Sequence, residues 1–301
     1  MTERYATDTY AVIGNPIAQS KSPLIHASFA RATGQVMNYT RLLGTVGAFA
    51  ADVNAFRQQG ACGLNVTAPF KLDAFAYATA LSVDAQLAGA VNALKFEGSS
   101  VLGENFDGVG LVRDIQSNLG VALRAKRVLL LGAGGATRGA LLPILRQLPA
   151  SLTIANRDLG KAYSLVAQVD AALHAAPAAA ASGQVQAQAQ AQAPLKGVLL
   201  ASSYSDVTGP FDVVINATSA SLFGELPPIA ASVFAPTCLA YDMVYGKGAT
   251  PFLQLARTCG VHQCADGVGM LVEQAAEAFA WWRGVRPDTG SVIAAITVPI
   301  V

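Results

Sequence analysis

The chain has few charged residues and no excess of either sign, which argues against two classes of partner. Charged residues make up 13% of the 301 residues, with 20 basic residues against 19 acidic ones. A protein that binds nucleic acid or an anionic membrane surface would carry an excess of Lys and Arg. The sequence therefore predicts no nucleic-acid or membrane partner and favours a protein that acts on a small molecule.

Cysteine and histidine are too scarce and too scattered for a metal site. The four cysteines, Cys62, Cys238, Cys259 and Cys264, show no C-x-x-C spacing, and there are only three histidines. A zinc site needs several such ligands, usually paired at close spacing. We therefore expect no metal, and we interpret the cysteines as free thiols in a reducing compartment.

Long apolar runs are also missing. No uninterrupted apolar stretch reaches the roughly 18 residues of a membrane span. The first ten residues, MTERYATDTY, are polar and lack the basic and apolar regions of a secretory signal. We therefore expect a cytoplasmic protein.

Apolar residues are abundant, at 52% of the chain, and they alternate between strand and helix patterns. Alternation of this kind predicts an α/β fold with a mostly parallel sheet. The predicted strands are residues 10–14, 38–43, 63–66, 92–96, 101–104, 127–131, 152–155, 198–201, 213–217 and 239–242. The main predicted helices are 22–34, 48–59, 71–80 and 271–282.

The length and the strand pattern indicate two domains, because single cores stop growing near about 250–300 residues. Residues 1–108 and 267–301 are predicted to form an N-terminal α/β substrate-binding domain, to which the C-terminal helix returns. Residues 109–266 are predicted to form a Rossmann-type dinucleotide-binding domain. Within it, residues 171–194 are rich in Ala and Gln and are typical of a low-complexity surface insertion.

A glycine-rich turn predicts the dinucleotide site. The run RVLLLGAGGATRGALLPIL places Gly132, Gly134 and Gly135 between a predicted strand and a predicted helix. Glycines let the backbone approach a pyrophosphate, and the helix N-terminus offers free N–H groups. Ala136 and Thr137 replace the third glycine of the usual pattern, so the evidence comes from the strand–turn–helix context.

The tip of the next strand bears on the choice of cofactor. Asn156 and Arg157 follow this strand, and Lys161 lies one turn later. An Arg fork and a second cation suit a 2′-phosphate, so NADP is the expected cofactor. Asp158 favours the alternative, NAD, if its carboxylate faces the same pocket.

Eight motifs occur in one order: GNPIAQSKSPLIH, GLNVTAPFK, AGAVNAL, NFDGVG, GAGGATRGALLPIL, NATS, YDMVYGKGATPFL and ADGVGMLVEQAAEAF. With them, the sequence resembles the shikimate dehydrogenase family from about Tyr10 to Pro287. The resemblance implies an enzyme that reversibly reduces 3-dehydroshikimate to shikimate with NADPH, in the chorismate pathway of aromatic amino-acid biosynthesis.

The resemblance also assigns roles to individual residues. It implies that Lys71 and Asp107 are catalytic. The implied substrate-binding residues are Ser20, Ser22, Thr67, Asn92, Tyr245 and Gln274. The implied cofactor-binding residues are Gly132, Ala133, Gly134, Gly135, Ala136, Asn156, Arg157 and Lys161, with Met243 and Gly267 beside the nicotinamide.

The sequence departs from the family pattern at three positions, Phe106, Asp158 and Lys161. The family motif NTDG reads NFDG here, with Phe106 in place of Thr. Since neighbours on an extended segment point opposite ways, we expect Phe106 to face the core and Asp107 to face the site. The family motif NRT reads NRD, and Lys161 replaces a second phosphate-binding Arg with a point charge.

In the implied reaction a Lys ammonium polarises the ketone and supplies a proton, while the Asp holds the Lys and a substrate hydroxyl. Which of the two is the formal acid stays open. One alternative is a quinate/shikimate dehydrogenase that uses NAD, and another is a non-catalytic, ligand-binding regulatory module. The sequence shows no pattern that indicates a subunit interface, so the oligomeric state stays open, with a homodimer as one alternative.

Overall fold

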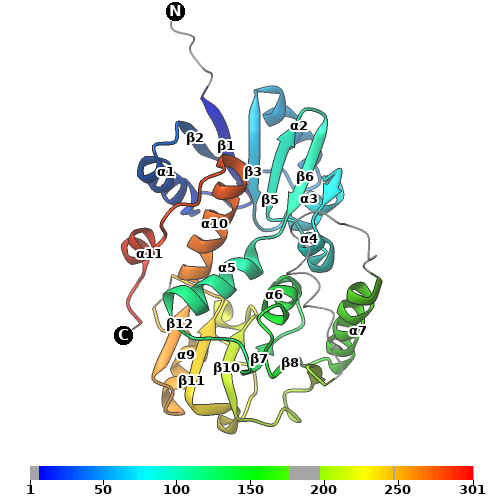
Figure 1. Ribbon diagram of the computed structural model, residues 1–301, viewed down its shortest axis with the longest axis vertical. Helices are drawn as coiled ribbons and strands as arrows, with labels where there is room; N and C mark the ends of the chain where they lie inside the picture. Colours follow the sequence, from blue (N-terminus) through cyan, green and yellow to red (C-terminus); the bar gives the residue numbers. More distant parts are fainter. Residues whose placement is uncertain (1–6, 176–196, 247, 301) are drawn as a thin grey trace, which may run out of the picture. The chain divides into compact units, whose positions relative to one another are not determined.

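The computed structural model describes residues 7–175, 197–246 and 248–300, and these form two compact units (Figure 1). The first unit contains the described residues up to Gly110 together with Leu271–Ala295. The second contains Leu111–Met270 and the described residues from Ile296 onward, although the sequence pattern predicts these last residues in the first domain. Of the predicted insertion at 171–194, residues 171–175 instead complete a helix, and the part from residue 176 lies outside the described residues.

The first unit is built on a six-stranded sheet in the order β2-β1-β3-β5-β6-β4. Its strands are β1 (Asp8–Gly14), β2 (Met37–Leu43), β3 (Ala61–Val66), β4 (Ala80–Leu81), β5 (Ala93–Glu97) and β6 (Ser100–Glu104). Its helices include α1 (Ser22–Thr33), α2 (Phe49–Gln58), α3 (Lys71–Tyr77) and α4 (Val83–Ala88). The predicted helix at 71–80 thus ends at Tyr77, and the chain then forms the short strand β4.

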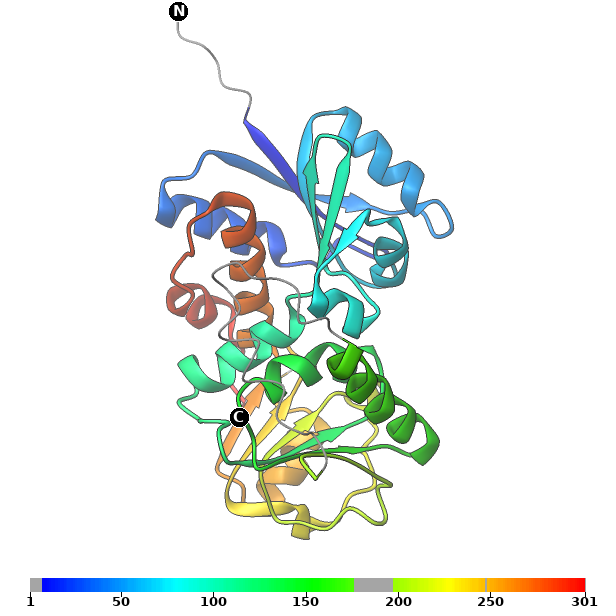
Figure 2. The same cartoon turned by 45° about the vertical axis from the view of Figure 1, so that its right-hand side comes forward.

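One strand of this sheet runs against its neighbours. The pairs β1–β2 and β1–β3 are parallel, but β5 is antiparallel to both β3 and β6. β5 and β6 form a hairpin whose loop is Gly98 and Ser99, visible in Figure 2. Gly98 has a φ of 60°, which a tight hairpin turn requires and glycine adopts without strain. The hairpin decides where the polar residues that flank its strands are placed.

Both faces of the first sheet are covered. On one face, Phe49 and Val53 of α2 and Ala74 of α3 pack with Leu64 and Leu94 of the sheet. On the other, Trp282 packs with Tyr10 and Ala93, and its indole Nε1 donates to the Leu94 carbonyl at 3.1 Å. Trp282 belongs to α10 (Val268–Arg283), so the predicted return of the C-terminal helix to the first sheet is confirmed.

The second unit contains an all-parallel, six-stranded sheet in the order β12-β11-β10-β7-β8-β9. Its strands are β7 (Arg127–Leu131), β8 (Ser151–Ala155), β9 (Leu199–Ser202), β10 (Phe211–Asn216), β11 (Phe234–Asp242) and β12 (Gln263–Asp266). This is the strand order of the Rossmann fold, with the topological switch between β7 and β10.

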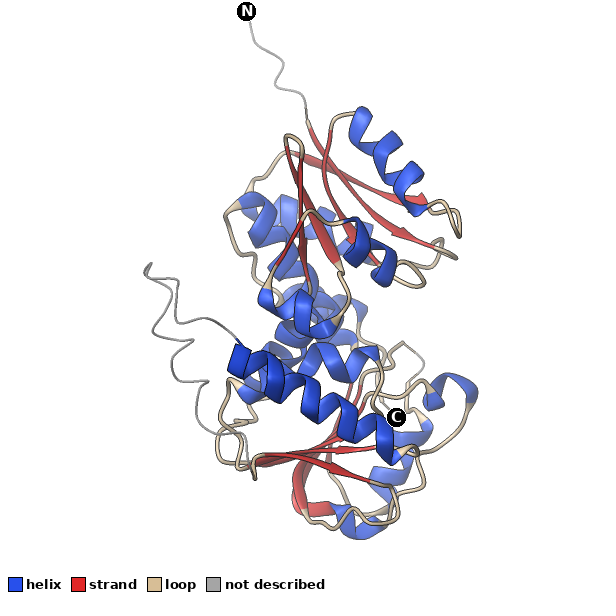
Figure 3. Ribbon diagram, turned by 90° about the vertical axis from the view of Figure 1, so that its right-hand side faces the viewer, coloured by secondary structure: helices blue, strands red, loops and turns tan. Residues whose placement is uncertain are grey.

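The run RVLLL in β7 shows why this sheet is buried on both sides. Val128 and Leu130 face a cluster formed with α6 (Gly135–Leu145) and α7 (Leu159–Ala175). Leu129 and Leu131 face a second cluster formed with α9 (Pro251–Thr258). Successive side chains on a strand point to opposite faces, so a strand with helices on both sides is apolar throughout. Figure 3 shows these helices on both faces of the second sheet.

The remaining described elements are short or terminal. They are α5 (Asp107–Arg113), the π-helical turn η1 (Asp114–Asn118), the 3₁₀ turns η3 (Ala220–Phe223) and η4 (Ala231–Val233), and α11 (Gly290–Ile296). None of the described helices is both long enough and apolar enough to cross a membrane.

His26 of α1 is an ionisable side chain in the core of the first unit. It is fully buried, its ring stacks on Tyr39 at a centroid distance of 4.1 Å, and neither ring nitrogen has a hydrogen-bond partner among the described residues. Burial lowers the pKa of His26 to about 3, and the Asn65 side chain raises this pKa by a smaller amount. His26 is therefore neutral in the folded protein.

This burial predicts an acid-sensitive stability. Below pH 6.5 the unfolded chain binds a proton at His26 that the folded chain does not, so this contribution is complete above pH 6.5 and lost as the pH falls toward about 3. Between pH 6.5 and 5 the loss amounts to about 2 kcal/mol. His26→Phe removes the titrating group and should reduce this pH dependence.

Urea unfolding, followed by the fluorescence of Trp281 and Trp282, measures the effect in the unit that contains His26. Plotted against pH, the free energies of unfolding of the wild-type protein and of His26→Phe should run parallel above pH 7 and diverge below it. Equal slopes from pH 7 to pH 5 would show that His26 titrates normally in the folded protein.

Candidate active site

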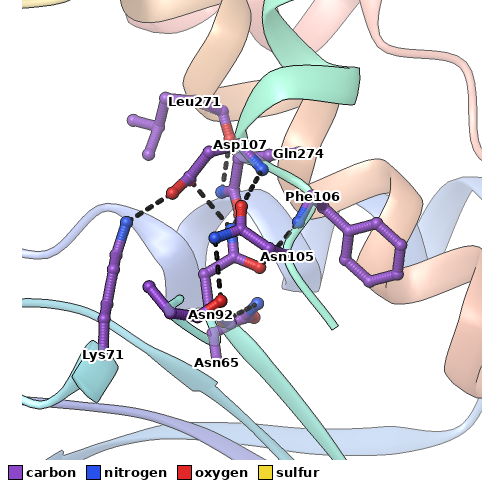
Figure 4. Close-up of polar contacts among 9 residues, drawn as sticks. Asn65, Lys71, Asn92, Asn105, Phe106, Asp107, Leu271 and Gln274 are labelled. Atoms are coloured by element: carbon purple, nitrogen blue, oxygen red, sulfur yellow. Dashed lines mark hydrogen bonds and ion pairs between the residues drawn. The ribbon is translucent and has the colours of Figure 1, made fainter. Parts of the chain in front are cut away.

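Lys71 and Asp107 form an ion pair at one edge of the first sheet. The Lys71 Nζ donates to the Asp107 Oδ2 at 2.5 Å (Figure 4). The Lys71 side chain is 35% exposed and the Asp107 side chain 19% exposed, so both remain reachable by a small molecule. The structure thus brings together the two residues to which the sequence assigned catalysis.

The sheet topology explains why these residues meet. Lys71 follows the end of β3, Asn92 precedes the start of β5, and Asp107 follows the end of β6. Because β5 runs antiparallel to both of its neighbours, its start lies beside their ends. Three segments that are distant in sequence therefore deliver polar side chains to one edge.

Asn92 holds Asp107 in position. Its amide Nδ2 donates to the Asp107 Oδ1 at 2.8 Å, and its Oδ1 accepts from the Phe106 N–H at 2.9 Å. Asn92 is only 2% exposed, so these bonds form away from bulk water, where they are strong. Asn105 adds a third restraint, because its Oδ1 accepts from the Asp107 N–H at 3.1 Å. Asn92 thus fixes the orientation of the Asp107 carboxylate, and Asn105 restrains its backbone.

Of two further predicted residues, Gln274 contacts Asn92 through its side chain, whereas Thr67 forms hydrogen bonds with other described residues only through its backbone. The Gln274 side chain, on α10, lies within 3.4 Å of the Asn92 Nδ2, which donates to its Oε1. Thr67 lies in the turn between β3 and α3, where its N–H donates to the Ile13 carbonyl at 3.0 Å and its carbonyl accepts from the Phe70 N–H. Its side chain makes no polar contact with another described residue, so its predicted role in substrate binding stays a prediction.

A polar chain joins this centre to the predicted carboxylate-binding serines. The Tyr39 hydroxyl donates to the Asn65 Oδ1 at 2.7 Å, and the Asn65 Nδ2 donates to the Asn92 carbonyl at 3.4 Å. Burial raises the pKa of Tyr39 well above its usual value, and hydrogen bonding to the Ser22 hydroxyl opposes this rise. The Ser20 hydroxyl in turn donates to the Ser22 Oγ at 3.2 Å.

Tyr39 and Asn65 were not assigned a role from the sequence, nor was Arg41. Arg41 donates from Nε and Nη2 to the Ser20 carbonyl, at 3.1 and 2.6 Å, and so holds the serine turn. The only sequence signal for Asn65 is a polar residue among the apolar residues of a buried strand. Tyr39 and Arg41 lie on β2, an edge strand whose side chains are partly buried or exposed, and such a pattern gives no functional signal.

Phe106 points away from the site, as its place in the NFDG motif suggested. Its ring packs edge to face on Trp281 at a centroid distance of 5.7 Å, within the cluster around Tyr10 and Trp282. Figure 4 shows Phe106 and Asp107 on opposite sides of the chain. The expectation that Phe106 faces the core while Asp107 faces the site is confirmed.

The glycine-rich turn lies at the carboxyl end of β7 in the second unit. Gly132 has a φ of +99°, a conformation that favours glycine, and Thr137 donates to its carbonyl at 2.7 Å. Gly134 and Gly135 are exposed, and a Cβ on either would meet no described protein atom within 4 Å. The start of α6 therefore presents an open backbone, which suits the approach of a pyrophosphate.

In the NRD motif that follows β8, the Asp158 carboxylate is bound within the protein, whereas the Arg157 side chain is exposed. The Asn156 Oδ1 accepts from the Ala133 N–H at 3.2 Å, which ties the tip to the glycine turn. The Asp158 Oδ1 accepts from the Lys161 N–H at 3.3 Å, so this carboxylate caps the start of α7. Arg157 and Lys161 are exposed, and neither side chain forms an ion pair or hydrogen bond with another described residue.

Met243 and Gly267 are neighbours in the second unit. A Cβ at Gly267 would overlap the Met243 carbonyl oxygen, so only glycine fits there. Tyr245, two residues after Met243, is 42% exposed in the same unit. Its predicted contact with the substrate stays a prediction.

The comparisons with known proteins agree with this geometry. Residues 12–94 match the family model for the shikimate dehydrogenase substrate binding domain, and residues 267–297 match that for the shikimate 5′-dehydrogenase C-terminal domain. The chain is 51% identical over 288 residues to the shikimate dehydrogenase (NADP(+)) of Nitrosospira multiformis, covering 95% of this chain and 96% of that protein. The chain belongs to the shikimate dehydrogenase family.

Further proteins match this chain over nearly their whole length. The shikimate dehydrogenase (NADP(+)) of Dechloromonas aromatica is 51% identical, covering 98% of this chain and 99% of that protein. The crystal structure of an Ael1 enzyme from Pseudomonas putida is 52% identical, with a TM-score of 0.87, covering 98% and 100% of the two chains. The shikimate 5-dehydrogenase of Thermus thermophilus, solved with NADP(H) and shikimate, is 26% identical, with a TM-score of 0.77 and coverage of 96% and 98%.

The capping contact of Asp158 predicts how this departure from the family motif behaves. Asp158→Ala should lower the free energy of unfolding by about 1 kcal/mol, because α7 loses its cap. Asp158→Asn keeps a capping oxygen and should leave stability nearly unchanged, while removing a negative charge that lies near Arg157. Its affinity for a dinucleotide with a 2′-phosphate should therefore stay equal or rise.

Chemical unfolding and fluorescence titration measure the two effects, with Arg157→Ala as the control that should weaken binding of the 2′-phosphate. A marked loss of that affinity in Asp158→Asn, with stability retained, would mean that the carboxylate serves the cofactor and not the helix.

Proposed function

We propose that the protein catalyses the reversible, NADP-linked reduction of 3-dehydroshikimate to shikimate. The observation that carries this proposal is the Lys71–Asp107 pair at 2.5 Å, oriented by Asn92 at the edge of the first sheet. Relatives that are about half identical over nearly the whole chain are named shikimate dehydrogenase (NADP(+)), which supports the same substrate and cofactor. This activity implies a role in aromatic amino-acid biosynthesis, and on the same ground we propose a cytoplasmic location.

Lys71 has the hydrogen-bonding capacity that reduction of a ketone requires. An ammonium group carries three donors, and the contact with Asp107 uses one of them. A further donor is able to bind the ketone oxygen, to stabilise the negative charge that develops on it and to deliver the proton. Asp107 fixes the direction of the ammonium group.

Asp107 also has capacity for the substrate. Its two oxygens offer about four acceptor positions, and Asn92 and Lys71 each occupy one. A ring hydroxyl of the substrate is therefore able to donate to the same carboxylate. Such a contact places the reacting carbon next to Lys71 and makes the reaction effectively intramolecular.

The other predicted residues complete the substrate site in this proposal. Ser20 and Ser22, which the polar chain through Tyr39 and Asn65 joins to the catalytic pair, bind the substrate carboxylate. The ring hydroxyls are bound by residues from several elements, namely Thr67, Asn92, Gln274 and Tyr245. The first unit is thus the substrate-binding domain and the second the NADP-binding domain.

The second unit fits NADP. The open backbone at Gly134 and Gly135 accepts the pyrophosphate, and the exposed side chains of Arg157 and Lys161 supply positive charge for the 2′-phosphate. In the same proposal Ala133, Ala136 and Asn156 complete the cofactor site, with Met243 and Gly267 beside the ring. The nicotinamide supplies the hydride when bound, and the protein's part is to orient it.

The direct test compares four reactions of the purified protein, with shikimate or quinate as substrate and NADP or NAD as cofactor. The proposal predicts the highest kcat/KM for shikimate with NADP. Faster oxidation of quinate with NAD would favour the NAD-linked quinate/shikimate dehydrogenase. Absence of turnover with all four pairs, by a protein that still binds shikimate, would favour the non-catalytic binding module.

The role of Lys71 predicts a separation of turnover from binding. Lys71→Ala should lower kcat by about two to four orders of magnitude, since proton transfer and charge stabilisation are both lost. Substrate affinity should fall much less, because the serines, Thr67 and Asn92 remain. Steady-state kinetics and calorimetric binding of shikimate measure the two quantities.

Lys95→Ala is the matched control. Lys95 lies on β5 of the same sheet, is also partly exposed, and pairs with Glu97 at 2.7 Å. This variant should keep normal turnover. Near-normal kcat in Lys71→Ala would remove Lys71 from the mechanism.

A further inference from the structure

Asp242 is a fully buried carboxylate at the end of β11, for which the proposed reaction has no use. Its Oδ1 accepts from the Asn216 Nδ2 at 3.2 Å and from the Val244 N–H at 3.1 Å. Its Oδ2 accepts from the Ser221 Oγ at 2.7 Å and from the Thr250 Oγ1 at 2.6 Å. Each carboxylate oxygen thus receives two hydrogen bonds.

These donors come from three separate segments. Asn216 ends β10, Ser221 belongs to the 3₁₀ turn after it, and Val244 and Thr250 lie in the loop between β11 and α9. All four donors are neutral groups, so Asp242 orders these loops as a charged acceptor and not as half of an ion pair. Hydrogen bonds to a charged group are stronger than neutral ones and are costly to lose in a buried site.

The ordering extends to the glycine turn. The Asn216 Oδ1 accepts from the N–H and the hydroxyl of Thr218, at 3.1 and 2.6 Å. The methyl group of Thr218 lies against Gly132, where a Cβ would approach it to 2.9 Å. The chain Asp242–Asn216–Thr218–Gly132 therefore spans the carboxyl ends of β11, β10 and β7.

The same carboxylate also restrains the loop that begins with Met243. Met243 lies between Asp242 and the bound Val244 N–H, and its own N–H donates to the Asn216 carbonyl at 3.0 Å. Its carbonyl packs directly against Gly267, where there is no room for a Cβ. In the proposed function, Met243 and Gly267 flank the nicotinamide.

We propose that Asp242 is a positioning residue that shapes the nicotinamide end of the cofactor site through Asn216, Ser221, Thr250 and the Met243 loop. The inference rests on the proposed function, because that function assigns the cofactor to these strand ends. Asp242 is fully buried and accepts its four hydrogen bonds from protein groups, so the effect proposed for it on the cofactor is indirect. It acts by fixing where Met243 and the glycine turn lie.

The test separates the binding of the two ligands. Asp242→Asn keeps the size of the side chain but removes its negative charge, so the four donors lose a charged acceptor, and the hydroxyls of Ser221 and Thr250 would have to turn and accept from the new amide NH2. The Kd for NADPH, measured by fluorescence titration, should rise about tenfold or more, the factor expected for one lost hydrogen bond to a charge. The KM for NADP should rise with it, and the Kd for shikimate should rise by a much smaller factor, since all of its proposed binding residues except Tyr245 lie in the other unit.

Two further variants keep the proposal falsifiable. Ser221→Ala removes one donor and should raise the Kd for NADPH about threefold, which decides the question if Asp242→Asn does not fold. Asp212→Asn alters a carboxylate at the other end of β10, where it accepts from the Arg127 N–H and the Lys126 Nζ. This control should leave the Kd for NADPH unchanged, although it lowers the melting temperature.

An unchanged Kd and KM for the nicotinamide cofactor in both Asp242→Asn and Ser221→Ala would overturn the proposal. An equal loss of shikimate and NADPH affinity would also overturn it, because that result indicates general destabilisation. If the wild-type protein binds NADPH but does not oxidise shikimate, the proposed function fails, and the binding titrations still decide the role of Asp242.

Discussion

The contact on which the proposed chemistry depends is the ion pair between Lys71 and Asp107. The two residues are 36 positions apart, and the antiparallel hairpin of β5 and β6 brings them to one edge of the sheet. Asn92, at the start of β5, then fixes the carboxylate by a hydrogen bond. β3 and β6 both run antiparallel to β5 and therefore end at the same edge, whereas a fully parallel arrangement of the three strands would move Asn92 to the opposite edge.

The second unit concentrates polar groups by a different rule. All the strands of its sheet are parallel, so every carboxyl end lies at the same edge. Gly132, Asn156, Asn216, Asp242 and Gly267 follow or end five of these strands. The open glycine turn, the exposed cations after β8 and the buried Asp242 network all belong to this edge. In the proposed function, the first unit provides the proton chemistry and the second a preorganised surface for the dinucleotide.

Much of the fold follows from the sequence, because burial on both faces of a parallel sheet leaves a clear signal. The run RVLLL predicts β7 with its correct bounds, and most other strands differ by one or two residues. The early part of β11 was missed, because Thr237 and Pro236 interrupt its apolar pattern. β4 has two residues and β12 reads QCAD, so neither shows an apolar run. The antiparallel direction of β5 depends on the turn at Gly98, which was not recognised as a hairpin signal.

The site could be predicted only in part. The family motifs supplied Lys71 and Asp107, and the structure places them in contact. The supporting residues Tyr39, Arg41 and Asn65 act through contacts with distant segments, which residue spacing does not encode. Asp158 shows the opposite case, since its type suggested a conflict with a 2′-phosphate, whereas its carboxylate caps α7. The residue type determines which hydrogen bonds and charges a side chain can offer, and the local backbone determines which partner the side chain contacts.

The most direct test of the account is a double-mutant cycle in kcat/KM for shikimate oxidation, with Lys71→Met, Asp107→Asn and the combined variant. If the two side chains act as one unit, the combined variant should be no more than about tenfold slower than the more impaired single variant. Losses that simply multiply in the combined variant would show that the two groups act independently, and would contradict the role given to their ion pair.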